Sequence, residues 1–146
     1  MTITWQRHTS VALPNRLLVD TTVWYALASP GDQFHGQART AYDRVIDRNQ
    51  EVWTTSYVLV ETIALVHRRL GFDLLASWER STRGGLRVYW VDGAVHNEAW
   101  GRFVANQGSG LSFVDWTTVV AAGRLGAHVF TFDQGFAREG VPVVPR

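Results

Sequence analysis

Short apolar runs of strand length alternate with longer segments of helical period along this chain of 146 residues. The runs lie at residues 16–20, 51–54, 86–91 and 128–132. Such alternation is typical of βαβ units, in which a helix crosses over between neighbouring parallel strands. The sequence therefore predicts an α/β fold built around a parallel sheet, at a length that suits one domain.

Residues 1–15 show no clear periodicity and end in Leu13-Pro14-Asn15, so we expect an N-terminal extension followed by a single domain over residues 16–146. Ser56 is expected to cap the helix that follows it, and Asp92 to cap the helix after the third strand. Helices are expected over residues 21–29, 37–48, 57–70, 72–81, 93–107 and 113–125, and a short edge strand over 141–144.

The composition counts against several kinds of chemistry. The chain has no cysteine, which excludes disulfides, thiolate nucleophiles and cysteine-ligated zinc, and all 14 basic residues are arginine. Walker-type phosphate loops, receiver domains and haloacid-dehalogenase-type phosphatases need a lysine near the reacting phosphate. No apolar stretch approaches the ~20 residues that span a bilayer, and the N-terminus lacks a signal-peptide pattern. We therefore expect a cytoplasmic protein with no membrane partner.

Four acidic residues interrupt or end strongly apolar segments: Asp20, Glu61, Asp115 and Asp133. A carboxylate in such surroundings costs free energy unless something compensates it. Asp20 and Asp133 come directly after predicted strands, and open α/β sheets place ligand sites at the carboxyl edge of their strands. If the fold brings the four acids together, the natural compensation is Mg²⁺ or Mn²⁺, because these cations prefer clustered oxygen ligands. The pattern predicts metal-assisted hydrolysis of a phosphodiester.

Three of these acids also have purely structural explanations. Asp20 and Asp133 are placed to cap the helical segments that follow them, and Ser112 with Asp115 matches a capping box. Glu61 lies too far from either end of its predicted helix to cap it. It either reaches solvent, pairs with an arginine two turns along the helix, or binds a ligand, and we favour the ligand.

The net charge of +1 conceals an uneven distribution. When the four acids are set aside, nine acidic residues remain against 14 arginines. A basic surface around an acidic centre suits a polyanion that is guided onto a metal site. A mildly basic surface without any steering role gives the same count, so charge alone leaves both interpretations open.

The acids lie in four motifs: Leu18–Trp24, Thr54–Thr62 with its continuation to Gly71, Gly110–Asp115, and Val129–Phe136. With these motifs the sequence resembles the PIN-domain nucleases, and within them the VapC toxins of bacterial toxin–antitoxin pairs. Order, spacing and flanking residues match over roughly residues 16–145.

The resemblance implies a three-layer α/β/α sandwich with a central parallel sheet. It implies a Mg²⁺- or Mn²⁺-dependent endoribonuclease that hydrolyses RNA. It also implies a small VapB-type antitoxin as partner, and a homodimer. The catalytic, metal-binding residues that it implies are Asp20, Glu61, Asp115 and Asp133, with Thr22 and Ser112 as polar support.

Three alternatives remain. A housekeeping PIN nuclease in RNA processing would use the same chemistry without an antitoxin. A catalytically silent PIN-like binding module is disfavoured because all four acids are present. A phosphatase with Asp20 as nucleophile would want a second aspartate near position 22 and a lysine, but the chain has Thr22 and no lysine.

Trp116 departs from the family pattern, where a small residue is expected. Three roles are open for it: it narrows the pocket, stacks on an RNA base or packs in the core.

Overall fold

The computed structural model describes residues 15–145, so the extension predicted over residues 1–15 lies outside the described residues except for Asn15. Five parallel strands form one sheet in the order β3-β2-β1-β4-β5, which confirms the predicted parallel sheet. The strands are β1 (Arg16–Val19), β2 (Glu51–Thr55), β3 (Leu86–Tyr89), β4 (His128–Phe130) and β5 (Val143–Val144).

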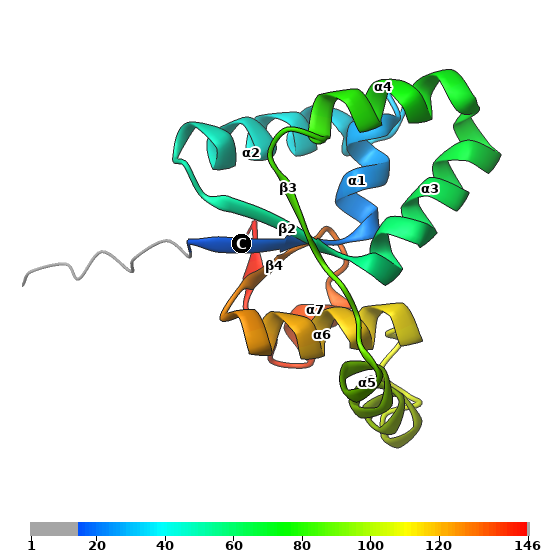
Figure 1. Ribbon diagram of the computed structural model, residues 1–146, viewed down its shortest axis with the longest axis vertical. Helices are drawn as coiled ribbons and strands as arrows, with labels where there is room; N and C mark the ends of the chain where they lie inside the picture. The colour runs from blue at the N-terminus through cyan, green and yellow to red at the C-terminus, as the bar shows by residue number, and fades with distance from the viewer. Residues whose placement is uncertain (1–14, 146) are drawn as a thin grey trace, which may run out of the picture.

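Helices cover both faces of the sheet and give the three layers of an α/β/α sandwich (Figure 1). Four helices, α1 to α4, pack together over one face, and α5, α6 and α7 cover the other. None of the helices between residues 15 and 145 is long and apolar enough to cross a membrane. The helices are α1 (Thr21–Ala28), α2 (His35–Asp47), α3 (Ser56–Leu70), α4 (Phe72–Thr82), α5 (Gly93–Ala105), α6 (Phe113–Leu125) and α7 (Gly135–Arg138).

The central strand β1 divides the hydrophobic core into two clusters. Leu17 and Val19 join one cluster together with Trp24, whereas Leu18 joins the cluster on the opposite face together with Trp116. Successive side chains of a strand point to opposite faces, so a strand covered on both sides is apolar throughout. Trp116 is 4% exposed and packs in the core, which is one of the three roles expected for it.

The predicted N-cap of α3 is wrong by one residue. Thr55 is the cap, and its side chain accepts a hydrogen bond from the N–H of Val58 at 3.0 Å. The hydroxyl of Ser56 instead accepts a hydrogen bond from the N–H of Val91 at 3.0 Å. Val91 is available because β3 ends at Tyr89, two residues before its predicted end.

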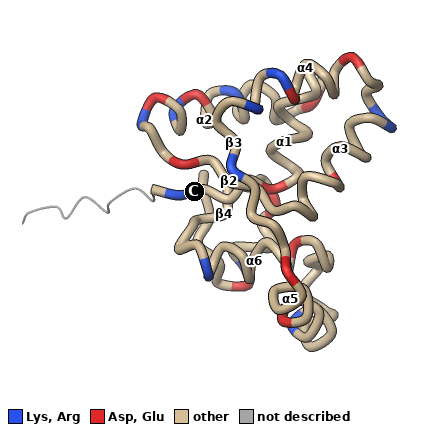
Figure 2. Tube along the Cα trace, viewed as in Figure 1, with Lys and Arg blue, Asp and Glu red and all other residues tan. Residues whose placement is uncertain are grey.

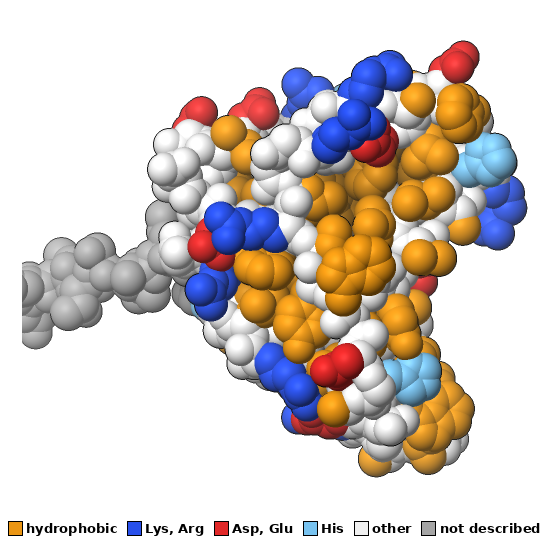
Figure 3. All heavy atoms as spheres, in the orientation of Figure 1, with side chains coloured by type: hydrophobic (Ala, Val, Ile, Leu, Met, Phe, Trp, Pro, Cys, Tyr) orange, Lys and Arg blue, Asp and Glu red, His pale blue; other side chains and the backbone are white. Residues whose placement is uncertain are grey.

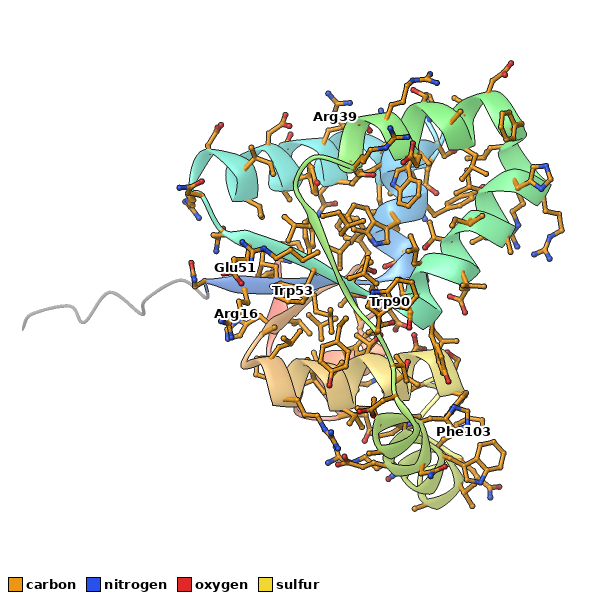
Figure 4. The ribbon with its side chains drawn as sticks, in the orientation of Figure 1. Arg16, Arg39, Glu51, Trp53, Trp90 and Phe103 are labelled. Atoms are coloured by element: carbon orange, nitrogen blue, oxygen red, sulfur yellow. The ribbon has the colours of Figure 1, made fainter. Side chains whose placement is uncertain are left out.

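A small polar network occupies the amino edge of the sheet, where β1 and β2 begin. Arg16 Nε and Trp53 Nε1 donate hydrogen bonds to the same oxygen of Glu51, at 3.0 Å and 2.9 Å, and the three side chains lie together in Figure 4. The bond from Trp53, followed by that from Arg16, lowers the pKa of Glu51. The charged and polar groups of this network are therefore paired with one another. The four predicted site residues lie elsewhere, and two of them follow strands at the opposite, carboxyl edge of the sheet.

Candidate active site

The carboxyl ends of β1 and β4 lie next to each other in the middle of the sheet. The chain extends the sheet from β1 towards β2 and β3 on one side, and from β4 towards β5 on the other. In an open α/β sheet, such a switch point leaves a crevice outside the strand ends, and ligands bind there. Asp20 directly follows β1, and Asp133 follows β4 after a short turn.

Asp20 is buried and is held by two hydroxyl groups. Thr22 Oγ1 and Thr131 Oγ1 each donate a hydrogen bond to Asp20 Oδ2 at 2.9 Å. Burial raises the pKa of Asp20, and the hydrogen bonds from Thr131 and Thr22 oppose that rise. Asp20 occupies the N-cap position of α1, but its side chain makes no capping hydrogen bond. Backbone N–H groups of Thr21 and Thr22 nonetheless favour the charged form and lower the pKa of Asp20, so this carboxylate is held by the start of α1 as well as by the two hydroxyls.

Thr131 is a site residue that the sequence prediction overlooked. Besides its bond to Asp20, its Oγ1 accepts a hydrogen bond from the N–H of Asp133 at 2.9 Å. It therefore joins the two acids that follow the central strands. The available signal was a lone hydroxyl between Phe130 and Phe132, directly after an apolar strand.

Glu61 reaches the site from the middle of α3. The buried Thr21 donates a hydrogen bond from Oγ1 to Glu61 Oε1 at 2.7 Å, and Thr21 is the neighbour of Asp20 in the chain. Within residues 15–145, Glu61 forms no ion pair, so the alternative of an arginine partner along the helix is not observed. Thr21 is the second supporting residue that the prediction overlooked.

Asp115 lies on the first turn of α6 and forms the predicted capping box with Ser112. The N–H of Asp115 donates to Ser112 Oγ at 3.1 Å, and the N–H of Ser112 donates to Asp115 Oδ2 at 2.8 Å. Burial raises the pKa of Asp115 to about 6; the charges of Asp20 and Asp133 add to that rise, and the bonds from Ser112 oppose it. Asp115 thus completes the capping box whose N-cap is Ser112, and its pKa is also raised by the charges of Asp20 and Asp133.

Asp133 stabilises the turn that leads into α7. Its Oδ1 accepts a hydrogen bond from the N–H of Gly135 at 2.8 Å, but the N-cap of α7 is Gln134, so the predicted capping position of Asp133 is wrong. A Cβ on Gly135 would lie 3.0 Å from both Asp133 Oδ1 and Leu111 Cδ2. A larger residue at this position would therefore push against the Asp133 carboxylate and the Leu111 side chain.

The four candidate acids come from both helical layers: Asp20 precedes α1, Glu61 lies on α3, Asp115 lies on α6 and Asp133 precedes α7. In Figure 2, acidic and basic positions are both spread over the chain, including the outer helices α2 and α4. Asp20, Asp115 and Asp133 interact through their charges or through Thr131, and Glu61 is joined to them through Thr21. We call Asp20, Glu61, Asp115 and Asp133 the acidic cluster.

The acidic cluster fits a hard divalent cation by the chemistry of its donors. Within residues 15–145, no three His, Asp or Glu side chains converge tightly enough to form a ready-made metal cage. Mg²⁺ does not require one, because it keeps several waters and binds one or two carboxylates together with substrate phosphates. Burial is the main cause of the raised pKa of Asp115, and a cation would relieve the smaller part that comes from the charges of Asp20 and Asp133. Within the described residues, the four acids therefore lie near one another without forming a complete set of ligands around one point.

Comparison with known proteins agrees with this fold. A family model described as PIN domain matches residues 17–141. The chain belongs to the PIN domain family. It is 30% identical over 126 residues to the 23S rRNA-specific endonuclease VapC20 of Mycobacterium tuberculosis, a match that covers 85% of this chain and 94% of that relative.

Solved structures place the chain more narrowly within the family. The crystal structure of Mycobacterium tuberculosis VapC20, described as a sarcin–ricin loop cleaving toxin, matches with a TM-score of 0.74 and 29% identity, over 86% of this chain and 95% of that one. VapBC2 of Rickettsia felis, bound to promoter DNA, has a TM-score of 0.69 at 13% identity, over 88% and 96% of the two chains, and shows the shared fold alone. The chain is a homologue of the VapC-type ribonuclease toxins.

Proposed function

We propose that this chain is a Mg²⁺- or Mn²⁺-dependent endoribonuclease that cuts RNA by attack of water on a phosphodiester, and that it is the toxin of a VapBC-type pair. The observation that carries the proposal is that Asp20 and Asp133 follow the two adjacent central strands, β1 and β4, and are joined through the hydroxyl of Thr131. Carboxylates that lie together at the carboxyl edge of a parallel sheet suit a cation and a phosphate ester.

The acidic cluster would hold the cation through the carboxylate oxygens of Asp20, Glu61, Asp115 and Asp133. When bound, such a cation activates water and neutralises the leaving oxygen, so the chemistry needs no histidine or lysine base. Products with 3′-hydroxyl and 5′-phosphate ends are expected from this mode of hydrolysis.

Four hydroxyl residues would orient the carboxylates before RNA binds. Thr22 and Thr131 fix one oxygen of Asp20, Thr21 fixes one oxygen of Glu61, and Ser112 fixes Asp115. Mutating a residue that holds a metal-binding side chain in position commonly lowers metal affinity or activity by about 10–100-fold. We therefore assign these hydroxyls a positioning role.

Ribosomal RNA is the substrate that we propose to test first. The Mycobacterium tuberculosis relative is 23S rRNA-specific, and 30% identity over most of both chains supports a related target. Purified protein is incubated with total RNA in Mg²⁺, in Mn²⁺ and in excess EDTA, and new 5′ ends are mapped. Cleavage confined to few sites and dependent on added metal is expected. Full cleavage in EDTA would contradict the mechanism.

We propose a small VapB-type antitoxin as partner and a cytoplasmic location for the pair. Several structural neighbours are VapBC complexes, including VapBC2 of Rickettsia felis, which supports this partner. A small antitoxin reading frame beside the gene would separate a toxin from a housekeeping PIN nuclease.

We also propose that residues 16–146 form one domain after an extension of residues 1–15. The sheet supports this division, because its strands run from residue 16 to residue 144.

We further propose a homodimer that forms through α3 and α5. The two helices are joined at one end, because Tyr57 Oη on α3 lies 2.6 Å from His96 Nδ1 on α5. Hydrophobic side chains gather over α3, α4 and α5 on the face shown in Figure 3. The large exposed apolar side chains of the two helices are Val60, Ile63, Trp100 and Val104.

Trp100→Glu is expected to convert the dimer to a monomer, because Trp100 is 54% exposed and a carboxylate there would be buried in the interface without a partner. Light scattering after size-exclusion chromatography measures the mass, against 16.4 kDa for one chain. Ile46→Glu, which replaces an apolar residue of α2 with 48% exposure, is the matched control and should stay dimeric. A monomeric parent protein would contradict the proposal.

Thr131→Val is expected to lower cleavage by about 10–100-fold, because the nearly isosteric side chain can neither donate to Asp20 nor accept from Asp133. Thr131→Ser keeps the hydroxyl and should retain most of the activity. Initial rates at saturating RNA, with melting temperatures as a control for folding, test this expectation. Equal rates for the valine variant and the parent would remove Thr131 from the site.

A further inference from the structure

Two phenylalanine rings form a stack beside the acidic cluster. The rings of Phe34 and Phe132 are 4.9 Å apart between centroids, with their planes inclined by 13°. Phe132 precedes Asp133, and its N–H donates to Thr22 Oγ1 at 3.1 Å. The same hydroxyl of Thr22 donates to Asp20, so the backbone that carries one ring of the stack is bonded to a residue that holds the cluster.

Both rings are fixed by contacts that do not involve any substrate. Phe132 meets the fully buried Phe130 edge to face, with centroids 6.4 Å apart and planes at 73°. Asp32 Oδ1 accepts the N–H of Phe34 at 2.8 Å, and His35 Nδ1 lies 2.7 Å from a carbonyl oxygen of α1. A ring that is ordered beforehand loses little conformational entropy when a ligand stacks on it.

The outer end of this stack faces solvent. Phe34 is 37% exposed, whereas Phe132 is partly buried between Phe34 and the core. An isolated exposed phenylalanine needs no explanation. Phe34 differs, because its backbone N–H is bonded to Asp32 and one face of its ring is covered by Phe132. Its other face can therefore bind a flat aromatic group next to the candidate nuclease site. Unpaired nucleobases of RNA stack on phenylalanine in this manner.

We propose that Phe34 is a stacking platform for an unpaired base of the RNA substrate, next to the phosphate that is cut. The proposal rests on the ribonuclease function proposed above. The base extends the Phe34–Phe132 stack, and the neighbouring phosphate then lies towards Asp20 and Asp133. Since every base has a flat face, the platform selects unpaired nucleotides rather than a particular base. It therefore favours loops over duplex RNA.

RNA binding by the Asp20→Asn protein tests the platform without cleavage of the probe. The probe is a fluorescein-labelled RNA hairpin with the sarcin–ricin loop sequence, and fluorescence anisotropy gives the dissociation constant. Adding Phe34→Ala is expected to weaken binding about tenfold, and Phe34→Trp to restore it. Phe72→Ala, which removes a more exposed phenylalanine at the start of α4, is the matched control and should change nothing. Equal affinity of the Phe34→Ala protein and its parent would overturn the proposal.

Kinetics on the chain with Asp20 intact separate this proposal from the proposed function. Phe34→Ala is expected to raise KM about tenfold with a smaller effect on kcat. An abasic nucleotide next to the cut should remove the difference between parent and variant. Loss of affinity for a VapB-type antitoxin with unchanged RNA binding would overturn the platform in favour of a protein contact. Cleavage that survives Asp20→Asn would instead overturn the assignment of the acidic cluster.

Discussion

Asp20→Asn is expected to abolish RNA cleavage, with a loss greater than about a hundredfold, and to leave the protein folded. Asparagine has almost the same shape and keeps an oxygen that accepts from Thr22 and Thr131. It removes the negative charge that a cation needs. Burial already raises the pKa of Asp20, so the neutral side chain suits the metal-free crevice better than the carboxylate does.

The measurement is the initial rate of cleavage at the mapped RNA sites, with a melting curve for each variant. Asp43→Asn is a matched control, because Asp43 is an exposed acid on α2 and its loss should not change the rate. The melting temperature of the metal-free Asp20→Asn protein should equal or exceed that of the parent. A rate within a fewfold of the parent would show that Asp20 is not part of the catalytic site.

Mn²⁺ at a concentration well above its dissociation constant is expected to raise the melting temperature by about 5 °C at pH 8, and by much less at pH 5. Asp115 has its pKa raised to about 6, and burial raises the pKa of Asp20 as well. At pH 5, protons therefore compete with the cation for these carboxylates. Thermal scans with and without Mn²⁺ across this pH range test the expectation, and a shift of equal size at both pH values would contradict it.

The same pKa values set how the metal-free protein responds to pH. Asp115 has a pKa of about 6 in the folded chain against an ordinary value of 3.8, so between about pH 4 and 6 the folded state binds more protons than the unfolded state. The contribution of Asp115 to the free energy of unfolding then falls as pH rises through this window. Melting temperatures in EDTA should decrease from pH 5 to pH 7, and the decrease should be smaller in Asp115→Asn.

The strands and helices could be predicted from the sequence because burial produces a regular pattern of apolar residues. Residues 17–19 are apolar without a break, since both faces of β1 are covered by helices. The capping box of Ser112 and Asp115 was legible because both partners lie within one turn of chain. The acidic residues themselves stood out against apolar neighbours, although their catalytic role remains a prediction.

Contacts between distant segments could not be read from local pattern. Thr55 and Ser56 are both good N-caps, and the choice between them is settled by Val91, which binds the hydroxyl of Ser56. Thr131 looked like one polar residue in an apolar run, because its partner Asp20 lies 111 positions away. Supporting residues of this kind emerge only once the order of the strands is known.

The adjacency of β1 and β4 also determines when during synthesis the site comes into being. Asp20 and Glu61 precede the loop at residues 108–110, whereas Asp115 and Asp133 follow it. Translation runs from the N-terminus, so Asp20 and Glu61 are made before the two acids that complete the cluster. A chain truncated before residue 108 would therefore keep the first pair of acids and lack the second pair.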